Sequence, residues 1–284
     1  MKLELRQVQK TYSDFKLNCS MEVRSGQVTG LIGRNGAGKS TTFKAVLGLI
    51  QIDEGSVLID DADIKRWDAN DKQRLGVVLS ESGFSSYLTV ADVIKIMSAM
   101  YEKFDKQAFE KQCKKFAIPL KKTIREFSTG MKAKLKVLIA MSHKAELLIL
   151  DEPTTGLDVM AREEILDILH SYMQDEKNSI LISSHISSDL ESLCDDIYLI
   201  EDGRIILHEE THVLLDEYGI IKVSREQYES MDKTYLMSVK EESYGYRCLT
   251  KEKQFYLENY PELTIEKGSI DGVYSVLVQG KAVN

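Results

Sequence analysis

One short stretch, Gly33–Thr41, constrains this chain more than any other part of its sequence. Its letters, GRNGAGKST, match the phosphate-binding pattern GxxxxGK[ST] at every required position. Residues 27–32, just before it, are typical of a buried strand, and residues 41–47 are typical of a helix. A strand, a glycine loop and a helix N-terminus in this order form a phosphate site. The sequence therefore predicts an α/β fold that binds a nucleotide triphosphate, and a glycine turn without a ligand is the alternative.

The residues of this loop have separate expected roles. Glycines allow the backbone to curl until successive N–H groups point at the β- and γ-phosphates. We expect Lys39 to supply a positive charge and Ser40 to offer its hydroxyl to Mg²⁺. The residues predicted to bind the nucleotide here are Gly33, Arg34, Asn35, Gly36, Ala37, Gly38, Lys39, Ser40 and Thr41.

Composition narrows the class of protein. A chain of 284 residues is long enough for one large α/β domain with a small appendage. The net charge of −8 argues against a broad nucleic-acid surface, which would need to be basic. Apolar runs are too short to span a membrane, and the N-terminal residues lack a signal-peptide core. We therefore expect a cytoplasmic protein that has no nucleic-acid partner and is neither secreted nor membrane-spanning.

Strand and helix patterns divide residues 1–210 into three kinds of segment. Most of this region alternates apolar runs with helical periodicity, which is typical of a mostly parallel core sheet. Residues 3–8 and 15–23 alternate with period two, which predicts an N-terminal antiparallel β-layer. Between 89 and 143 strand patterns are absent, so a helical insert is expected there.

Residues 211–284 are predicted to form a small C-terminal α+β extension. Strands are expected at 220–223, 236–239 and 273–278, and Ser224 with Gln227 resembles a capping box that opens a helix. A segment of this size makes a marginal core alone. We therefore expect it to dock on the main domain or on a partner chain.

Two carboxylates follow a second buried run, Leu147–Leu150. Asp151 and Glu152 come directly after it, where an α/β sheet presents its ligand-binding edge. We expect Asp151 to face Mg²⁺ and Glu152 to act as general base on an attacking water. Acidic residues also end strands as solvated caps, which is the alternative.

Phe127–Lys132 adds a more specific pattern, and with it the chain resembles the nucleotide-binding subunit of an ATP-binding-cassette (ABC) transporter. Ser128 and Gly130 match the family's LSGGQ signature, whereas Thr129 and Met131 replace a glycine and a glutamine. The resemblance implies that these four residues open a helix and grip the γ-phosphate bound to an opposite subunit. It therefore implies a homodimer or heterodimer of ATPase subunits. An ordinary N-cap is the alternative for the serine.

The resemblance assigns three further positions. It implies that Tyr12 stacks on adenine and that Asp158 belongs to the loop connecting the two active sites of the dimer. It implies that His185 is catalytic and holds the γ-phosphate and the attacking water. A tyrosine on a half-buried strand, a plain turn and a structural histidine are the respective alternatives.

One position departs from the family pattern. Ser80 stands where the family has a glutamine that links Mg²⁺ and water to the membrane partner. We predict that Ser80 is a metal ligand, and the alternative is that the neighbouring Glu81 takes this role. If it does, Glu81→Gln should lower hydrolysis.

Three features make the chain most similar to ATPase subunits of bacterial exporters: the letters GMK at 130–132, the letters GLD at 156–158 and the short C-terminal extension. This resemblance implies a function. The chain is expected to bind ATP and Mg²⁺, dimerise, hydrolyse ATP and power a separate transmembrane permease at the inner face of the membrane, exporting a drug, antimicrobial peptide or lipid. Phe84, Tyr87 and Leu88 are candidates for a groove that receives the permease, with core packing as the alternative. Two other functions remain open: a non-transport ABC ATPase acting on nucleic acid or ribosomes, and a regulatory subunit that binds nucleotide with little hydrolysis.

Overall fold

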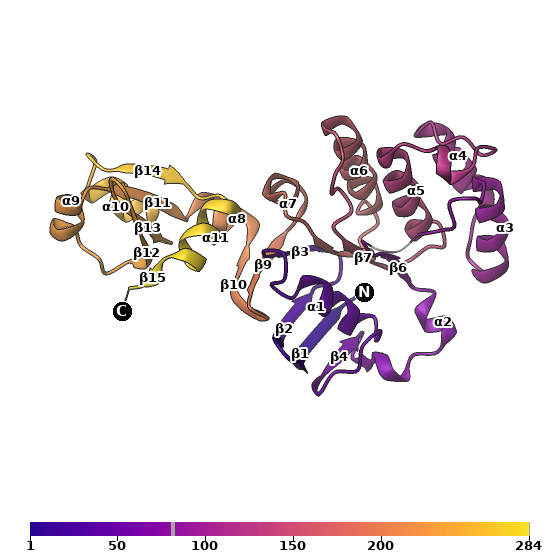
Figure 1. Cartoon of the computed structure of the whole chain (residues 1–284), viewed down its shortest axis with the longest axis horizontal. Coiled ribbons are helices and arrows are strands. Elements are labelled where there is room, and N and C mark those ends of the chain that lie inside the picture. The colour runs from indigo at the N-terminus through magenta and orange to yellow at the C-terminus, as the bar shows by residue number, and fades with distance from the viewer. Residues whose placement is uncertain (81–82, 284) are drawn as a thin grey trace.

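A computed structural model describes residues 1–80 and 83–283 of the chain. Within them the strands form one sheet of ten strands and a separate sheet of five. Figure 1 shows the large sheet flanked by helices and the small sheet at the opposite end of the molecule. None of the described helices is long and apolar enough to cross a membrane.

The parallel part of the large sheet is buried on both faces. Leu148 and Leu150 belong to the apolar cluster that includes the helical residues after Thr89. Leu147 and Ile149 belong to a second cluster, formed with the N-terminal strands and the helix after the glycine loop. Burial on both sides explains why these strands read as continuous apolar runs. The parallel strands are β3 (Val28–Ile32), β6 (Leu75–Val78), β7 (Leu147–Asp151), β8 (Ser179–Ser183) and β9 (Asp196–Glu201), in the order β9-β3-β8-β7-β6.

The other half of the large sheet is antiparallel. β1 pairs antiparallel with both β2 and β4, which confirms the layer that the period-two pattern predicts. β10 pairs antiparallel with β9 and bridges to β2, and so joins the two halves. These strands are β1 (Leu3–Thr11), β2 (Lys16–Val23), β4 (Glu54–Ile59), β5 (Ala62–Asp63) and β10 (Arg204–Glu210).

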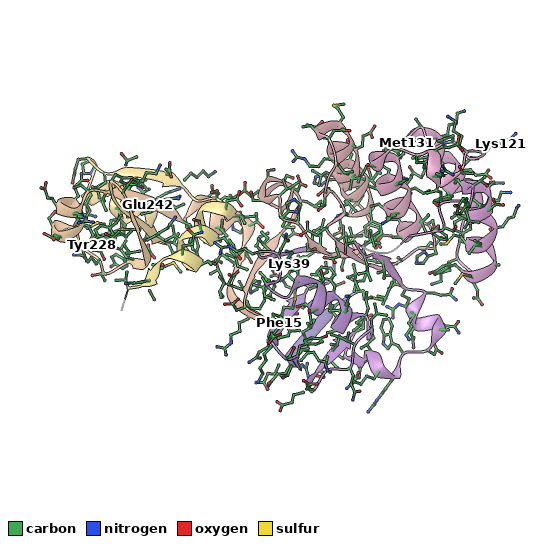
Figure 2. The ribbon with its side chains drawn as sticks, in the orientation of Figure 1. Phe15, Lys39, Lys121, Met131, Tyr228 and Glu242 are labelled. Atoms are coloured by element: carbon green, nitrogen blue, oxygen red, sulfur yellow. The ribbon has the colours of Figure 1, made fainter. Side chains whose placement is uncertain are left out.

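Helices cover both faces of this sheet. The segment predicted to be helical, 89–143, holds α3, α4, η2 and α5, and a capping box between Thr89 and Asp92 opens α3. Lys39 and Phe15 lie in the middle of the molecule, well apart from Met131 at the start of α5 (Figure 2). The helices are α1 (Lys39–Val46), η1 (Ile64–Arg66), α2 (Ala69–Lys72), α3 (Val90–Met100), α4 (Lys106–Lys115), η2 (Ile124–Glu126), α5 (Thr129–Met141), α6 (Val159–Tyr172) and α7 (Ser187–Leu193).

The C-terminal segment builds an antiparallel sheet in the order β14-β11-β13-β12-β15. Ser224 and Gln227 form the predicted capping box at the start of α9. Leu214, Tyr218 and Val273 share the apolar cluster of the large sheet, so this segment docks on the main domain. Its elements are α8 (Thr211–Asp216), β11 (Gly219–Val223), α9 (Arg225–Ser230), β12 (Leu236–Glu242), β13 (Gly245–Thr250), α10 (Lys253–Asn259), β14 (Thr264–Lys267), α11 (Ile270–Gln279) and β15 (Lys281–Ala282).

The strand predicted at 273–278 is wrong, because these residues belong to helix α11. Ser269 caps this helix by accepting a hydrogen bond from the Gly272 N–H. Ile270, Val273 and Val276 are its fully buried residues, and their spacing of three places them on one helical face. A short apolar run fits a buried strand and a buried helix equally well, so packing decides between them.

Candidate nucleotide site

The glycine loop connects β3 to α1 at the carboxyl end of β3, where the parallel strands of the large sheet end. Gly38 adopts φ 116° directly before α1, a backbone conformation that favours glycine. At Gly33 a Cβ atom would lie 2.4 Å from the carbonyl oxygen of Ile200, so no side chain fits there. The two glycines let the loop turn sharply against β9 and deliver the start of α1 to the sheet edge.

The Lys39 ammonium lies inside the curl of the loop. Its Nζ donates to the carbonyl oxygen of Gly33 at 2.6 Å and to that of Arg34 at 3.3 Å. The carboxylate of Glu152 is 3.5 Å away, and the lysine is almost fully buried. A buried positive charge held by carbonyl oxygens is placed to meet an anion that enters the loop.

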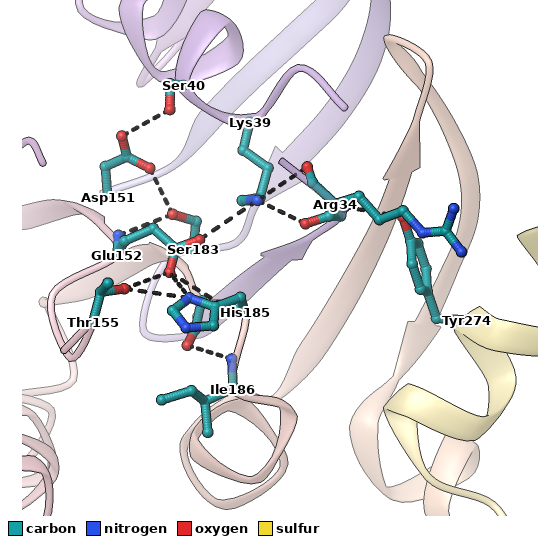
Figure 3. Close-up of polar contacts among 12 residues, drawn as sticks. Arg34, Lys39, Ser40, Asp151, Glu152, Thr155, Ser183, His185, Ile186 and Tyr274 are labelled. Atoms are coloured by element: carbon teal, nitrogen blue, oxygen red, sulfur yellow. Dashed lines mark hydrogen bonds and ion pairs between the residues drawn. The ribbon is translucent and has the colours of Figure 1, made fainter. Parts of the chain in front are cut away.

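A chain of hydroxyls links the loop to the end of β7 (Figure 3). The Ser40 hydroxyl donates to Asp151 Oδ2 at 3.0 Å, and the Ser183 hydroxyl donates to Oδ1 of the same carboxylate at 2.7 Å. Ser183 also accepts a hydrogen bond from the Glu152 N–H at 3.1 Å. Ser183 therefore fixes both carboxylate residues relative to β8.

Glu152 turns away from Asp151 because its φ is 54°, in the left-handed region. Its Oε2 accepts hydrogen bonds from the Thr155 hydroxyl at 2.8 Å and from the His185 N–H at 3.2 Å. His185 Nδ1 lies 2.6 Å from the same oxygen. Burial alone would raise the pKa of Glu152, but the hydrogen bonds from His185 and Thr155 and the charge of Lys39 outweigh it and lower the pKa. The carboxylate is thus held in its ionised form.

These groups surround one cavity of about 1270 Å³. A cavity of this size, with a buried cation on one wall and an ionised carboxylate on another, suits a polyanionic nucleotide. The predicted site residues that line it are Gly33, Arg34, Asn35, Gly36, Gly38, Lys39, Ser40, Thr41, Ser80, Thr129, Asp151, Glu152 and His185.

Other predicted residues occupy structural positions outside this lining. Ser128 caps α5 by accepting from the Met131 N–H at 3.2 Å, and Asp158 caps α6 by accepting from the Ala161 N–H at 2.9 Å. A Cβ on Gly130 would lie 2.8 Å from that of Ala161, so α5 and α6 pack closely there.

The last of these positions differ in their surroundings. Ala37 belongs to the loop and is buried in the apolar cluster of the N-terminal strands. Met131 packs against the apolar cluster that includes the helical residues after Thr89. Tyr12 is 44% exposed. Its ring centroid lies 6.4 Å from that of Phe15, which does line the cavity. Glu81 lies outside the described residues.

Several residues of the site were not predicted from the sequence. Thr155 and Ser183 stand within motifs noted in the sequence, yet their hydroxyls received no role. Lys132 and Lys136 line the cavity together with Thr129. Their spacing of three and seven residues from Thr129 on α5 is the helical periodicity that could have revealed this shared face.

Known proteins resemble this chain in sequence and in fold. A family model described as ABC transporter matches residues 17–155. The ABC transporter ATP-binding protein YtrB of Bacillus subtilis (strain 168) is 30% identical over 224 residues, which cover 78% of this chain and 76% of YtrB. The lantibiotic transport ATP-binding protein SrtF of Streptococcus pyogenes is 34% identical over 211 residues, 73% of this chain and 90% of SrtF.

A solved structure extends the resemblance to three dimensions. It is described as the ATP binding subunit of an ABC transporter, and it matches with a TM-score of 0.66 and 25% identity. The match covers 75% of this chain and 92% of that structure.

Proposed function

The chain belongs to the family of ATP-binding subunits of ABC transporters, and we propose that it powers export through a separate membrane-spanning permease. It is an ATPase cassette of the exporter type. The observation that carries the proposal is the cluster of Glu152, His185 and Thr155 facing Lys39 across one cavity. A general base held ionised beside a phosphate loop is the arrangement that ATP hydrolysis requires.

In this proposal each side chain has one task. Lys39 and the N–H groups of the loop neutralise the triphosphate, and Tyr12 stacks on the adenine ring. Glu152 takes the proton from the attacking water, which raises the nucleophilicity of its oxygen. His185, held against that carboxylate, orients the water and the γ-phosphate. The Thr155 hydroxyl donates to the same carboxylate oxygen and helps to fix it.

The residues present also suit Mg²⁺. Ser40 Oγ and Asp151 Oδ2 lie 3.0 Å apart, and Ser80 lines the same cavity. All three offer oxygen atoms, which Mg²⁺ prefers. We propose that Ser40, Asp151 and Ser80 hold the ion, directly or through water. When bound, Mg²⁺ neutralises charge on the β- and γ-phosphates.

We further propose that two such subunits close over ATP. Ser128 caps α5, and Thr129, Gly130 and Met131 form its first turn. The N–H groups at a helix N-terminus favour an anion. In the proposed dimer this turn binds the γ-phosphate on the partner subunit, and the Asp158 loop connects the two sites. Next to that aspartate, Val159 and Met160 are 59% and 69% exposed, which fits a contact with a second subunit. Homodimer and heterodimer both fit.

A second cavity supports a permease partner. It measures about 290 Å³ and lies between the large sheet and the helical segment. Leu49 and Val77 line it and are 60% and 37% exposed. Exposed apolar groups along a groove are typical of a docking site for an amphipathic helix. We propose that a cytoplasmic helix of the permease docks there and holds the subunit at the inner face of the membrane.

The candidates Phe84, Tyr87 and Leu88 differ in exposure. Phe84 and Leu88 pack against the core, whereas Tyr87 is 76% exposed. Of the three, Tyr87 alone therefore offers its ring to a partner. As for cargo, the similarity to a lantibiotic transport protein favours a drug, an antimicrobial peptide or a lipid.

The test is to solubilise membranes of the source organism in mild detergent and to identify what co-purifies with the tagged chain. We expect a polytopic membrane protein. Leu49→Asp should abolish this co-purification while the purified variant still binds ATP, because Leu49 lies in the groove and not in the nucleotide cavity. Co-purification of ribosomes or nucleic acid instead would favour a non-transport ATPase.

A further inference from the structure

Helix α11 of the C-terminal segment reaches the phosphate loop. The Arg34 N–H donates a hydrogen bond to the Tyr274 hydroxyl oxygen at 3.0 Å. The Tyr274 hydroxyl donates in turn to the carboxylate of Glu201, at the end of β9. Figure 3 shows Tyr274 on one side of Arg34 and Lys39 on the other. The tyrosine oxygen is therefore held between the loop and the large sheet.

The peptide between Gly33 and Arg34 connects Tyr274 to Lys39. Its N–H donates to Tyr274, and its carbonyl oxygen accepts the 2.6 Å hydrogen bond from Lys39 Nζ. Because a peptide group is planar, rotation of this group moves both contacts together. The hydroxyl of Tyr274 thus sets the orientation of a carbonyl that positions the ammonium.

The start of α11 makes a second link to the site. The Ser187 hydroxyl donates to Asp271 Oδ2 at 2.7 Å, and the Ile270 N–H donates to Glu191 Oε1 at 2.9 Å. Ser187 opens α7, two residues after His185. One helix therefore contacts both the phosphate loop and the segment that follows the histidine.

Packing fixes α11 in place. Ile270, Val273 and Val276 are fully buried and share an apolar cluster with Leu190 and Ile197 of the main domain. A helix anchored in this way presents its polar groups at defined positions.

The hydroxyl of Tyr274 keeps its proton at neutral pH. Burial and the neighbouring Glu201 carboxylate raise the pKa of Tyr274 to about 12. The hydroxyl therefore donates to Glu201 while its oxygen accepts from the loop.

We propose that Tyr274 is a positioning residue for ATP: it holds the Gly33–Arg34 peptide, and through it Lys39, in the orientation that receives the triphosphate. The inference rests on the proposed assignment of Gly33–Thr41 to the nucleotide. When the loop is already ordered, none of the binding energy of ATP is used to order it. Loss of this order therefore weakens ATP binding more than it slows the chemical step. The C-terminal segment is by this account part of the nucleotide site.

The experiment compares Tyr274→Phe with Tyr256→Phe in the full chain. The Tyr256 hydroxyl donates to the carbonyl oxygen of Asp232 at 3.0 Å, a contact inside the C-terminal segment. Tyr274→Phe loses the hydrogen bonds of its hydroxyl with Arg34 and Glu201, and Tyr256→Phe loses its hydrogen bond to Asp232. The melting temperature checks that each variant is folded. We expect Tyr274→Phe to raise KM for ATP about fivefold with kcat within about twofold of the parent, and Tyr256→Phe to leave both unchanged.

Hydrogen exchange gives a direct view of the loop. Without its acceptor, the Arg34 amide should exchange faster in Tyr274→Phe than in the parent chain. The inference would be overturned if Tyr274→Phe and the parent chain had the same KM for ATP and the same exchange rate at the Arg34 amide. An equal rise of KM in both variants would also overturn it, because it would mean a general loosening of the C-terminal segment.

Lys39→Ala separates this inference from the assignment of the site. Loss of ATP binding in Lys39→Ala with no effect of Tyr274→Phe overturns only the role of the tyrosine. ATP binding that survives Lys39→Ala overturns the proposed site and the inference together.

Discussion

His185 Nδ1 lies 2.6 Å from Oε2 of Glu152. Because an ionised carboxylate can only accept, Nδ1 carries the proton and the imidazole ring is held in one orientation. The Thr155 hydroxyl donates to the same oxygen, and Lys39 faces the other. The pair joins the ends of β7 and β8, so base and histidine approach the cavity from neighbouring parallel strands.

Glu152→Gln should retain ATP binding and lower turnover about 10²- to 10⁴-fold, because the amide cannot take a proton from water. Nucleotide binding and single-turnover hydrolysis measure the two effects separately. Glu54→Gln is a suitable control, since Glu54 is exposed and its carboxylate contacts Gln9. Hydrolysis near the parent rate in Glu152→Gln would show that this carboxylate is not the base.

Ser128→Ala should impair hydrolysis beyond its effect on stability. Asp105 caps α4 by accepting from the Ala108 N–H at 2.9 Å, as Ser128 caps α5. Either alanine variant should lower the free energy of unfolding by about 1 kcal/mol. Only Ser128→Ala should also lower ATPase activity about tenfold or more, because it removes the contact that we propose with the γ-phosphate on the partner subunit.

Thermal unfolding and ATPase activity at several protein concentrations measure both effects. If the two variants lose activity equally, Ser128 is a helix cap and nothing more.

Much of the fold follows from local patterns. Strands β3, β7 and β8 are buried on both sides, so they appear in the sequence as uninterrupted apolar runs beside the phosphate loop. Glu152 and His185 could be placed at one edge of the sheet because each follows such a strand.

What could not be predicted depends on contacts between distant residues. Arg34 and Tyr274 meet 240 positions apart, and no local pattern marks that contact. The Val273–Val278 run fits a strand as well as a helix, and its burial against β12, β13 and α7 decides in favour of the helix. The hydroxyls of Thr155 and Ser183 position Glu152 and Asp151, and these contacts exist only once the fold has brought the side chains together.

Arg74→Met should make the chain less sensitive to acid. Arg74 Nη2 donates to Glu146 and to Asp60, each at 2.8 Å. The hydrogen bond from Arg74 lowers the pKa of Glu146 in spite of partial burial. For Asp60, burial would raise the pKa, but hydrogen bonds from the Lys2 N–H and Arg74 outweigh it. Both carboxylates therefore have a lower pKa in the folded chain than in the unfolded chain.

The sign follows from proton uptake. In acid the unfolded chain binds more protons at Glu146 and Asp60 than the folded chain does. The two ionised carboxylates therefore stabilise the fold above about pH 4.5, and this stabilisation is lost as the pH falls through their lowered pKa values. After allowance for solvent screening, Arg74→Met should lower the free energy of unfolding at pH 7 by about 1 kcal/mol and flatten its decline in acid.

Urea unfolding at a series of pH values measures this. Arg225→Met, which removes an exposed pair with Glu241, is the control and should cost less than about 0.5 kcal/mol. A steeper acid decline in Arg74→Met than in the parent would contradict the assignment.

Tyr12 and Phe15 should contribute to the binding of different parts of the nucleotide. Phe15 lines the cavity, and a Cβ placed on Gly38 would lie 3.0 Å from its ring, so Phe15 supports the phosphate loop. Tyr12 is half-exposed at the rim, and we propose that it stacks on adenine. Tyr12→Ala should weaken ATP binding about fivefold or more and leave binding of inorganic triphosphate unchanged, because triphosphate has no base. Phe15→Ala should weaken both.

Competition binding with ATP and with inorganic triphosphate measures the two affinities in each variant. Tyr12→Phe is the matched control and should bind ATP like the parent, because stacking needs the ring and not the hydroxyl. If Tyr12→Ala loses affinity for both ligands equally, the tyrosine supports the loop and does not contact the base. If it loses affinity for neither, adenine is bound by other residues of the cavity, with Phe15 the first to test, since its ring already lies beside the loop.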